Sequence, residues 1–195
     1  MRIIIFRIKC LLSIPFYLWF RLGDYGCLLE ELRRWEEVLP VVKYKNDFFA
    51  FIRMFAAFPE YRSLFLFRVG LYDFRFLISH QKTLHIISDS EVLGKGLVFQ
   101  HGFSSIIFPE SLGENCQIWH NVTIGRARDK GARPKIGNNV RVCAGAILLG
   151  DITIGDNVTI AAGCVVVKSI PANCLVVGNP AYIIKRNGIK VHECL

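Results

Sequence analysis

Histidines in polar surroundings are the residues of this chain best suited to proton transfer. The sequence has five, His80, His85, His101, His120 and His192, of which His101 lies in "FQHG" and His120 in "IWHNVTIG". Because imidazole titrates near neutral pH, it can take the proton of a hydroxyl group as the oxygen attacks a carbonyl carbon. The sequence therefore predicts base chemistry and offers several candidates for the base.

A polar, mostly basic stretch interrupts the second half of the chain. "GRARDKGARP" (125 to 134) carries Arg126, Arg128, Lys130 and Arg133 between two short aliphatic–glycine steps. Four cations so close together could contact phosphates or an acidic ligand, and the alternative is the solvated tip of a loop. The net charge of +8 is spread over the whole length and also suits an acidic membrane surface or nucleic acid.

Aliphatic residues recur every six positions from residue 87 onward. With one extra residue before Ile106 and a step of twelve before Ile136, the series is Ile87, Leu93, Phe99, Ile106, Leu112, Ile118, Ile124, Ile136, Val142, Leu148, Ile154, Ile160 and Val166. Neither an amphipathic helix nor an alternating strand has this period, whereas each six-residue face of a parallel β-helix points one aliphatic residue inward. The pattern predicts such a β-helix, with glycines at its turns.

The first third of the chain is predicted to be helical. Residues 28–40 place apolar residues at helical spacing until Pro40, and residues 46–78 predict two more apolar helices that break near Pro59. The many aromatic residues of this region are expected to form a core or an interface.

The first 22 residues are apolar and aromatic, with four cations among them. Their best apolar run has eleven residues with a proline inside, whereas a membrane span needs about 20. A signal peptide has similar regions, but no small-residue cleavage site follows. Two interpretations stay open: a helix on the membrane surface with its cations at the headgroups, or packing against the protein or another subunit.

The repeats resemble those of the hexapeptide-repeat acyltransferases, in the serine acetyltransferase branch and close to O-acetyltransferases of polysaccharide biosynthesis. The resemblance is carried by "LGKGLVFQHG", "RPKIGNNV", "CAGAILLGDITIGDNVTIAAGCVVVKSIP" and "VVGNPAYIIK", and it covers about residues 44–186. It implies a mainly β fold, a left-handed parallel β-helix over residues 84–186, after an α-helical region at 1–83 and before a tail at 187–195. It further implies a homotrimer, with the pairing of trimers left open, and acetyl-CoA in the groove between subunits under a loop at 125–135.

The resemblance favours His101 as the base, because the family reads "DHGTG" or "DHATG" at this place. His120 is the second candidate, and His85 could orient another group. The family pairs its histidine with a carboxylate before the first coil, but counting back from His101 without gaps reaches Ile86.

The half of the site that would bind the acceptor departs from the family pattern. The family has aspartate where this chain has Gln100, and Arg-His before Pro-Lys where this chain reads Ala132-Arg133, although Asp47 stands where an acceptor-binding aspartate is expected. Free serine needs one anionic and one cationic partner close together. We therefore expect the acceptor to be a sugar hydroxyl in exopolysaccharide or capsule assembly, with Trp119 stacked on the sugar, and keep L-serine as the alternative.

The half that would bind acetyl-CoA keeps the family pattern. Small residues at Gly125, Ala144 and Ala162 are expected to leave the groove open for pantetheine. The cations that the resemblance places near the nucleotide phosphates are Lys168, Lys185 and Arg186; their alternative role is solubility.

Other classes of function fit less well. A β-helical zinc enzyme similar to carbonic anhydrase would want an HxxxxH pair, which the sequence lacks, so no metal is expected. The charge alone allows a non-catalytic trimeric scaffold, but no platform for nucleic acid is recognisable. Seven cysteines without a CxxC pair are typical of a reducing cytoplasm.

Overall fold

The computed structural model describes residues 2–39, 43–73 and 78–195, so the predicted helix stop at Pro40 lies outside the described residues. It has two compact units, Met1–Gln81 and Lys82–Leu195. The first unit contains helices α1 (Arg2–Leu22), α2 (Tyr25–Val38), α3 (Asp47–Ala57) and α4 (Pro59–Arg68). The second contains β1 (Leu84–Ile86), the 3-10 helix η2 (Ser90–Val92), β2 (Val98–Phe99), β3 (Ser105–Ile107), β4 (Ser111–Leu112), β5 (Gln117–Ile118), β6 (Thr123–Gly125), β7 (Lys135–Ile136), β8 (Arg141–Val142), β9 (Ile147–Leu149), β10 (Thr153–Ile154), β11 (Thr159–Ile160), β12 (Val165–Val166), β13 (Cys174–Val177), β14 (Tyr182–Arg186) and β15 (Ile189–Cys194).

The helical unit is built around stacked aromatic rings. Helix α3 ends at Ala57 and α4 begins at Pro59, because proline has no N–H to continue a helix but fits its first turn. The ring of Phe51 lies 4.9 Å from that of Phe20 and 5.2 Å from that of Phe65, and all three side chains are buried. The aromatic residues of this region therefore form its core, as predicted.

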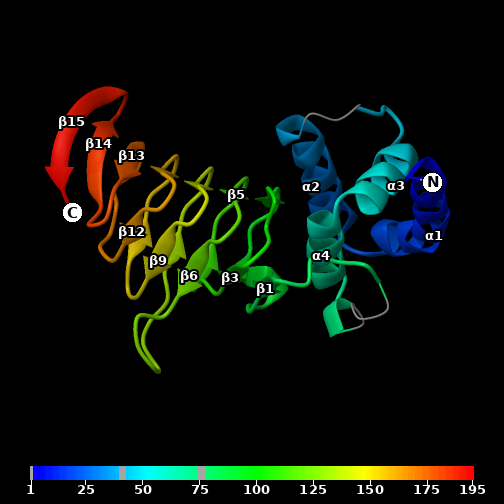
Figure 1. The fold of residues 1–195 in the computed structure, drawn as a ribbon, viewed down its shortest axis with the longest axis horizontal. Coiled ribbons are helices and arrows are strands. Elements are labelled where there is room, and N and C mark those ends of the chain that lie inside the picture. The colour runs from blue at the N-terminus through cyan, green and yellow to red at the C-terminus, as the bar shows by residue number, and fades with distance from the viewer. Residues whose placement is uncertain (1, 40–42, 74–77) are drawn as a thin grey trace. The chain divides into compact units, whose positions relative to one another are not determined.

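The second unit is a parallel β-helix with three sheets as its faces (Figure 1). The strand orders are β1-β3-β6-β9-β12, β10-β7-β4 and β15-β14-β13-β11-β8-β5-β2. Val142 pairs with Ile160 and Leu148 with Val166, so equivalent residues of these coils are separated by 18 positions, or three hexads. The predicted left-handed β-helix preceded by helices is confirmed.

The interior of the β-helix follows the hexads with two exceptions. Eleven of the thirteen predicted residues are buried, but Ile87 and Ile106 are 49% and 43% exposed. Their neighbours Ile86 and Ile107 point inward instead, because the coil has two extra residues between Phe99 and Ile107. Strand β1 pairs with β3 in the register that places Ile86 opposite Ile107. The first coil is therefore displaced by one residue as well, and Ile86 points inward in place of Ile87.

Residues 187–195, predicted as a tail, belong to the sheet. Strand β15 pairs antiparallel with β14, and Arg186 faces Ile189 across the turn. Asn187 and Gly188 both have positive φ, 49° and 81°, which is the conformation of a two-residue hairpin turn. The Asn187-Gly188 pair is a sequence signal for such a turn, so the sequence could have predicted a hairpin here instead of a tail.

A column of glycines lets successive coils approach each other closely. A Cβ on Gly113 would lie 2.5 Å from the carbonyl carbon of Gly137 in the next coil. We therefore expect Gly113→Ala to lower the free energy of unfolding by about 1–3 kcal/mol, measured by thermal or urea denaturation. Gly125→Ala is the matched control, because nothing lies within 4 Å of a Cβ there; equal stability of the two variants would contradict this account.

Candidate active site

One corner of the β-helix stacks two aromatic rings and two small side chains in successive coils. Backbone N–H groups connect them: Asn121 donates to the carbonyl of Phe103 at 3.0 Å, Gly145 to that of His120 at 3.0 Å, and Gly163 to that of Ala144 at 2.9 Å. The stacked residues are Phe103, His120, Ala144 and Ala162. This corner therefore changes from rings to methyl groups along the β-helix, and we call it the His120 corner.

The ring of His120 is held by stacking. Its centroid lies 4.7 Å from that of Phe103, with 17° between the planes. Its Nδ1 is buried and has no hydrogen-bond partner among the described residues. Sequence reasoning missed Phe103, because the contact joins residues of two coils. It also depends on two extra residues between Phe99 and Ile107, whereas the hexad count allowed one, before Ile106.

His101 lies in the insertion that widens the same coil. Its φ is +55°, a left-handed conformation that is uncommon for residues other than glycine. Its carbonyl accepts a hydrogen bond from the N–H of Phe103 at 2.7 Å, and the residue is exposed. Eight other described residues besides glycine, Ser104 and Asn121 among them, share this conformation, so it marks a turn of the coil that presents His101 to solvent.

The remaining histidines differ in their surroundings. His85 is exposed on β1. Its neighbour Ile86 is buried in the core and has no carboxylate that could pair with a histidine, as the family pattern would require at this place. In the helical unit, Nδ1 of His80 lies 2.9 Å from the carbonyl oxygen of Ile78. The ring of His192 packs 4.8 Å from that of Tyr182.

Gln100 and Trp119 occupy equivalent positions in neighbouring coils, each just before the His120 corner. The N–H of Gln100 donates to the carbonyl of Ile118, the residue before Trp119. The buried Gln117 donates from Nε2 to Oε1 of Gln100 at 2.6 Å. Gln117, which sequence reasoning missed, orients Gln100. The structure thus brings five predicted residues to one corner: Gln100, Trp119, His120, Ala144 and Ala162.

The base of the loop at 125–135 is held by an ion pair and an aromatic ring. Nε and Nη2 of Arg133 donate to Oε2 of Glu110 at 3.1 and 2.9 Å. The guanidinium carbons of Arg133 and Arg126 lie 4.5 and 5.1 Å from the centre of the Phe108 ring. Arg133 is therefore engaged by Glu110, a partner the sequence did not indicate. The exposed cations at the tip are Arg128 and Lys130.

Asp47 has partners inside the helical unit. The hydroxyl of Tyr25 donates to its Oδ2 at 2.6 Å, and Nη2 of Arg33 donates to its Oδ1. The hydrogen bond to the Asp47 carboxylate raises the pKa of Tyr25. An ammonium group of an acceptor would have to compete with Arg33 for this carboxylate.

The residues predicted for the acetyl-CoA side are spread along the β-helix. Gly125 is buried at the end of β6, Ala144 is half-buried and Ala162 is exposed. The cations near the last coils have contacts of their own: Nη2 of Arg186 pairs with Glu193 at 2.5 Å, and Nζ of Lys168 donates to the carbonyl of Leu195 at 2.7 Å. Lys185 is exposed on β14.

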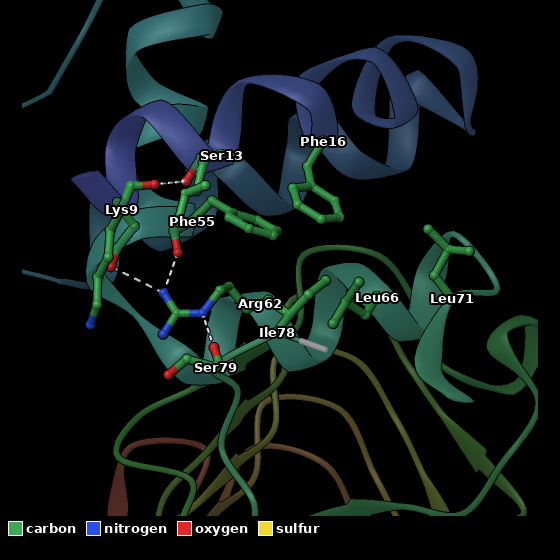
Figure 2. Close-up of a pocket in the computed structure, with 11 residues that line it drawn as sticks. Lys9, Ser13, Phe16, Phe55, Arg62, Leu66, Leu71, Ile78 and Ser79 are labelled. Carbon is green, nitrogen blue, oxygen red and sulfur yellow. Dashed lines mark hydrogen bonds between the residues drawn. The ribbon is translucent and has the colours of Figure 1, made fainter. Parts of the chain in front are cut away.

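A cavity of about 480 Å³ lies within the helical unit (Figure 2). Apolar side chains such as Phe16, Phe55 and Leu66 line most of it. Two cations, Lys9 and Arg62, also line it. Arg62 donates to the carbonyls of Phe55, Ala56 and Ser79, and burial lowers its pKa to about 10. No histidine or carboxylate is among the described residues that line the cavity, so it offers no general base of the kind available at the His120 corner.

The sequence of the chain is similar to sequences of known transferases. Residues 133–168 match the family described as "Bacterial transferase hexapeptide (six repeats)". The chain is 42% identical over 107 residues to the serine acetyltransferase of Staphylococcus aureus strain Mu50, and it spans about half the length of that relative (51% of this chain, 48% of the other). It is 37% identical over 153 residues to the serine acetyltransferase of Synechococcus elongatus, which corresponds to 72% of this chain and 63% of the relative.

Solved structures agree. Neisseria gonorrhoeae serine acetyltransferase superimposes with a TM-score of 0.69 at 28% identity, over 90% of this chain and 70% of the other; its complex with serine gives 0.65 at 29%, over 83% and 69%. The Brucella abortus enzyme in complex with coenzyme A gives 0.63 at 25%, over 90% and 74%. The repeats, the preceding helices and these relatives make the chain similar to the hexapeptide-repeat transferases, and among them to serine acetyltransferases.

Proposed function

We propose that the protein is an acetyl-CoA-dependent O-acetyltransferase that acts on L-serine. The observation that carries this proposal is the His120 corner, where His120 is followed in the next coils by the small side chains of Ala144 and Ala162, with the exposed His101 two residues before Phe103. The relatives support the acceptor, because those named above are serine acetyltransferases. These relatives favour L-serine, which the sequence analysis kept as the alternative acceptor, over the sugar hydroxyl that it expected.

In the proposed reaction, His101 takes the proton of the serine hydroxyl as its oxygen attacks the thioester carbonyl. The C–O bond forms, the C–S bond breaks, and the proton passes to the thiolate of coenzyme A. Burial raises the pKa of Cys143, which adjoins Ala144, so this thiol stays protonated and is a poor nucleophile. Direct transfer to the acceptor therefore fits the corner better than an acyl-enzyme on Cys143.

We further propose that the protein is a cytoplasmic homotrimer that binds acetyl-CoA in the groove between subunits. The small side chains of Ala144 and Ala162 support a place for pantetheine in that groove, because they leave the backbone open to hydrogen bonds. Arg128 and Lys130 at the tip of the loop are available to the phosphates of coenzyme A or to the acceptor carboxylate.

Ala162→Phe should raise the KM for acetyl-CoA at least about tenfold, because the ring would fill the space proposed for pantetheine. The free energy of unfolding should change little, since Ala162 is exposed. Steady-state kinetics with varied acetyl-CoA measures the effect. Ala172→Phe, also exposed but at a different corner, is the control; an unchanged KM for the Ala162 variant would place the donor elsewhere.

A sugar hydroxyl is the second candidate acceptor. The observation in its favour is Gln100, an uncharged amide held by Gln117 where the resemblance leads one to expect an aspartate. A direct test is to incubate the purified protein with acetyl-CoA and either L-serine or a panel of saccharides, and to identify the product by mass spectrometry. O-acetyl-L-serine supports the proposal, whereas an acetylated saccharide alone would replace L-serine as the acceptor.

A further inference from the structure

The outward face of α1 is apolar along its length. Five large side chains on it are between 50% and 82% exposed, and they are Ile4, Ile8, Leu11, Leu18 and Leu22. Their spacing of three, four or seven residues places them in one stripe of an α-helix, with Pro15 in the gap. We call this set the outer stripe. By length and hydropathy the segment Ile3–Leu22 could also cross a membrane.

The opposite face of α1 packs on α3. Phe16 stacks on Phe55 with 4.9 Å between centroids, and Tyr17 meets Phe48 edge-on at 5.0 Å. Phe20 is fully buried. These contacts hold the helix lengthwise against its unit, so inserting it across a bilayer as a separate span would expose this aromatic face. A helix held in this way can present its outer stripe, together with the exposed Leu12 and Trp19 beside it, to a lipid surface.

Charged residues border the outer stripe, and they have one sign. On a helical projection Arg7 and Arg21 lie along one edge of the outer stripe, and both are exposed. Lys9 lies toward the packed face and lines the cavity of the helical unit. No Asp or Glu occurs before Asp24. An apolar stripe bordered by cations is typical of helices that lie in the interface of an anionic bilayer.

The charges favour a lipid surface over a second copy of the chain. In an antiparallel pair of α1 helices, Arg7 of one copy would approach Arg21 of the other, and neither helix supplies an acidic residue to neutralise them. Anionic headgroups complement Arg7 and Arg21 while the acyl chains cover the stripe. We propose that α1 docks the protein on an anionic phospholipid bilayer, with the helix in the plane of the surface. This proposal does not depend on acetyl transfer.

Vesicle flotation tests the proposal, because aggregated protein does not float. The full-length protein, diluted out of mild detergent, is mixed with phosphatidylcholine vesicles or with vesicles that also contain phosphatidylglycerol. We expect it to float with the anionic vesicles and much less with the neutral ones, and to be released by salt. Failure to float with anionic vesicles would overturn the proposal whatever the enzyme assay shows.

Paired variants separate the stripe from the charges. Leu11→Glu with Leu18→Glu should reduce the floated fraction at least about tenfold, while the same change at the exposed Val167 and Ile189 should not. Arg7→Glu with Arg21→Glu should abolish the preference for anionic vesicles, while Lys82→Glu with Lys190→Glu, both exposed, should keep it. If the stripe variant does not fold, the charge variant and its control still test the proposal.

A different partner would show in the same experiments. If the stripe variant floats like the wild type but has a smaller mass in light scattering, α1 binds another copy of the chain and the proposal is wrong. Equal losses in the variants and their controls would also contradict it, because the effect would then not belong to α1.

Discussion

His101→Asn is expected to lower kcat for acetyl transfer by about 10²–10⁴-fold, the usual contribution of a general base. Asparagine is the informative replacement because it tolerates the left-handed conformation that His101 adopts, with φ at +55°. The backbone of the corner should therefore persist while the imidazole is lost. Steady-state kinetics and the thermal midpoint, measured on the same preparation, give the two readouts.

His120→Asn is the matched control. It removes the stacking on Phe103, so it should lower the thermal midpoint while reducing kcat less than the His101 change does. If the His101 variant keeps full activity and the His120 variant loses it, the base is His120. A parallel fall of midpoint and kcat in the His101 variant would mean that the residue supports the corner and not the chemistry.

Gln100→Asp is expected to raise kcat/KM for L-serine by about 10- to 100-fold, mainly through KM. A carboxylate at this position would give the ammonium group of serine the anionic partner that an amide cannot, and a hydrogen bond between charged groups contributes about 1.5–3 kcal/mol. Gln117 can still donate to the shorter side chain. The measurement is initial velocity with varied L-serine at saturating acetyl-CoA.

Gln100→Asn keeps the amide and is the control for side-chain length. It should not improve the use of L-serine. A Gln100→Asp enzyme that loses turnover of a saccharide and gains none with L-serine would show that the amide serves a sugar hydroxyl. In that case the departure from aspartate marks a change of acceptor rather than a tolerated substitution.

The repeating interior was predictable because each coil must bury the same kind of side chain. An aliphatic residue every six positions has few physical solutions, so residues such as Val142 and Leu148 were placed correctly. The prediction was wrong at Ile87 and Ile106 because two extra residues widen one coil, and a count along the sequence cannot tell which side of the insertion keeps the register. The hairpin after Arg186 had a local signal, Asn187-Gly188.

Contacts between coils were not predictable from the sequence. The stacking of His120 on Phe103 and the ion pair of Arg133 with Glu110 join residues 17 and 23 positions apart, and nothing local marks them as partners. Asp47 was expected to bind an acceptor, but the sequence could not show that Tyr25 and Arg33 already occupy its oxygens. Each of these contacts follows from tertiary packing rather than from a motif.

The most direct test of the central claim is the rate at which the purified protein releases thiol from acetyl-CoA with and without L-serine. We predict release that depends on L-serine, yields one equivalent of O-acetyl-L-serine per thiol, and is lost in His101→Asn. An absence of release with L-serine and with every saccharide tried would contradict the account, and would leave a β-helical scaffold in place of an enzyme.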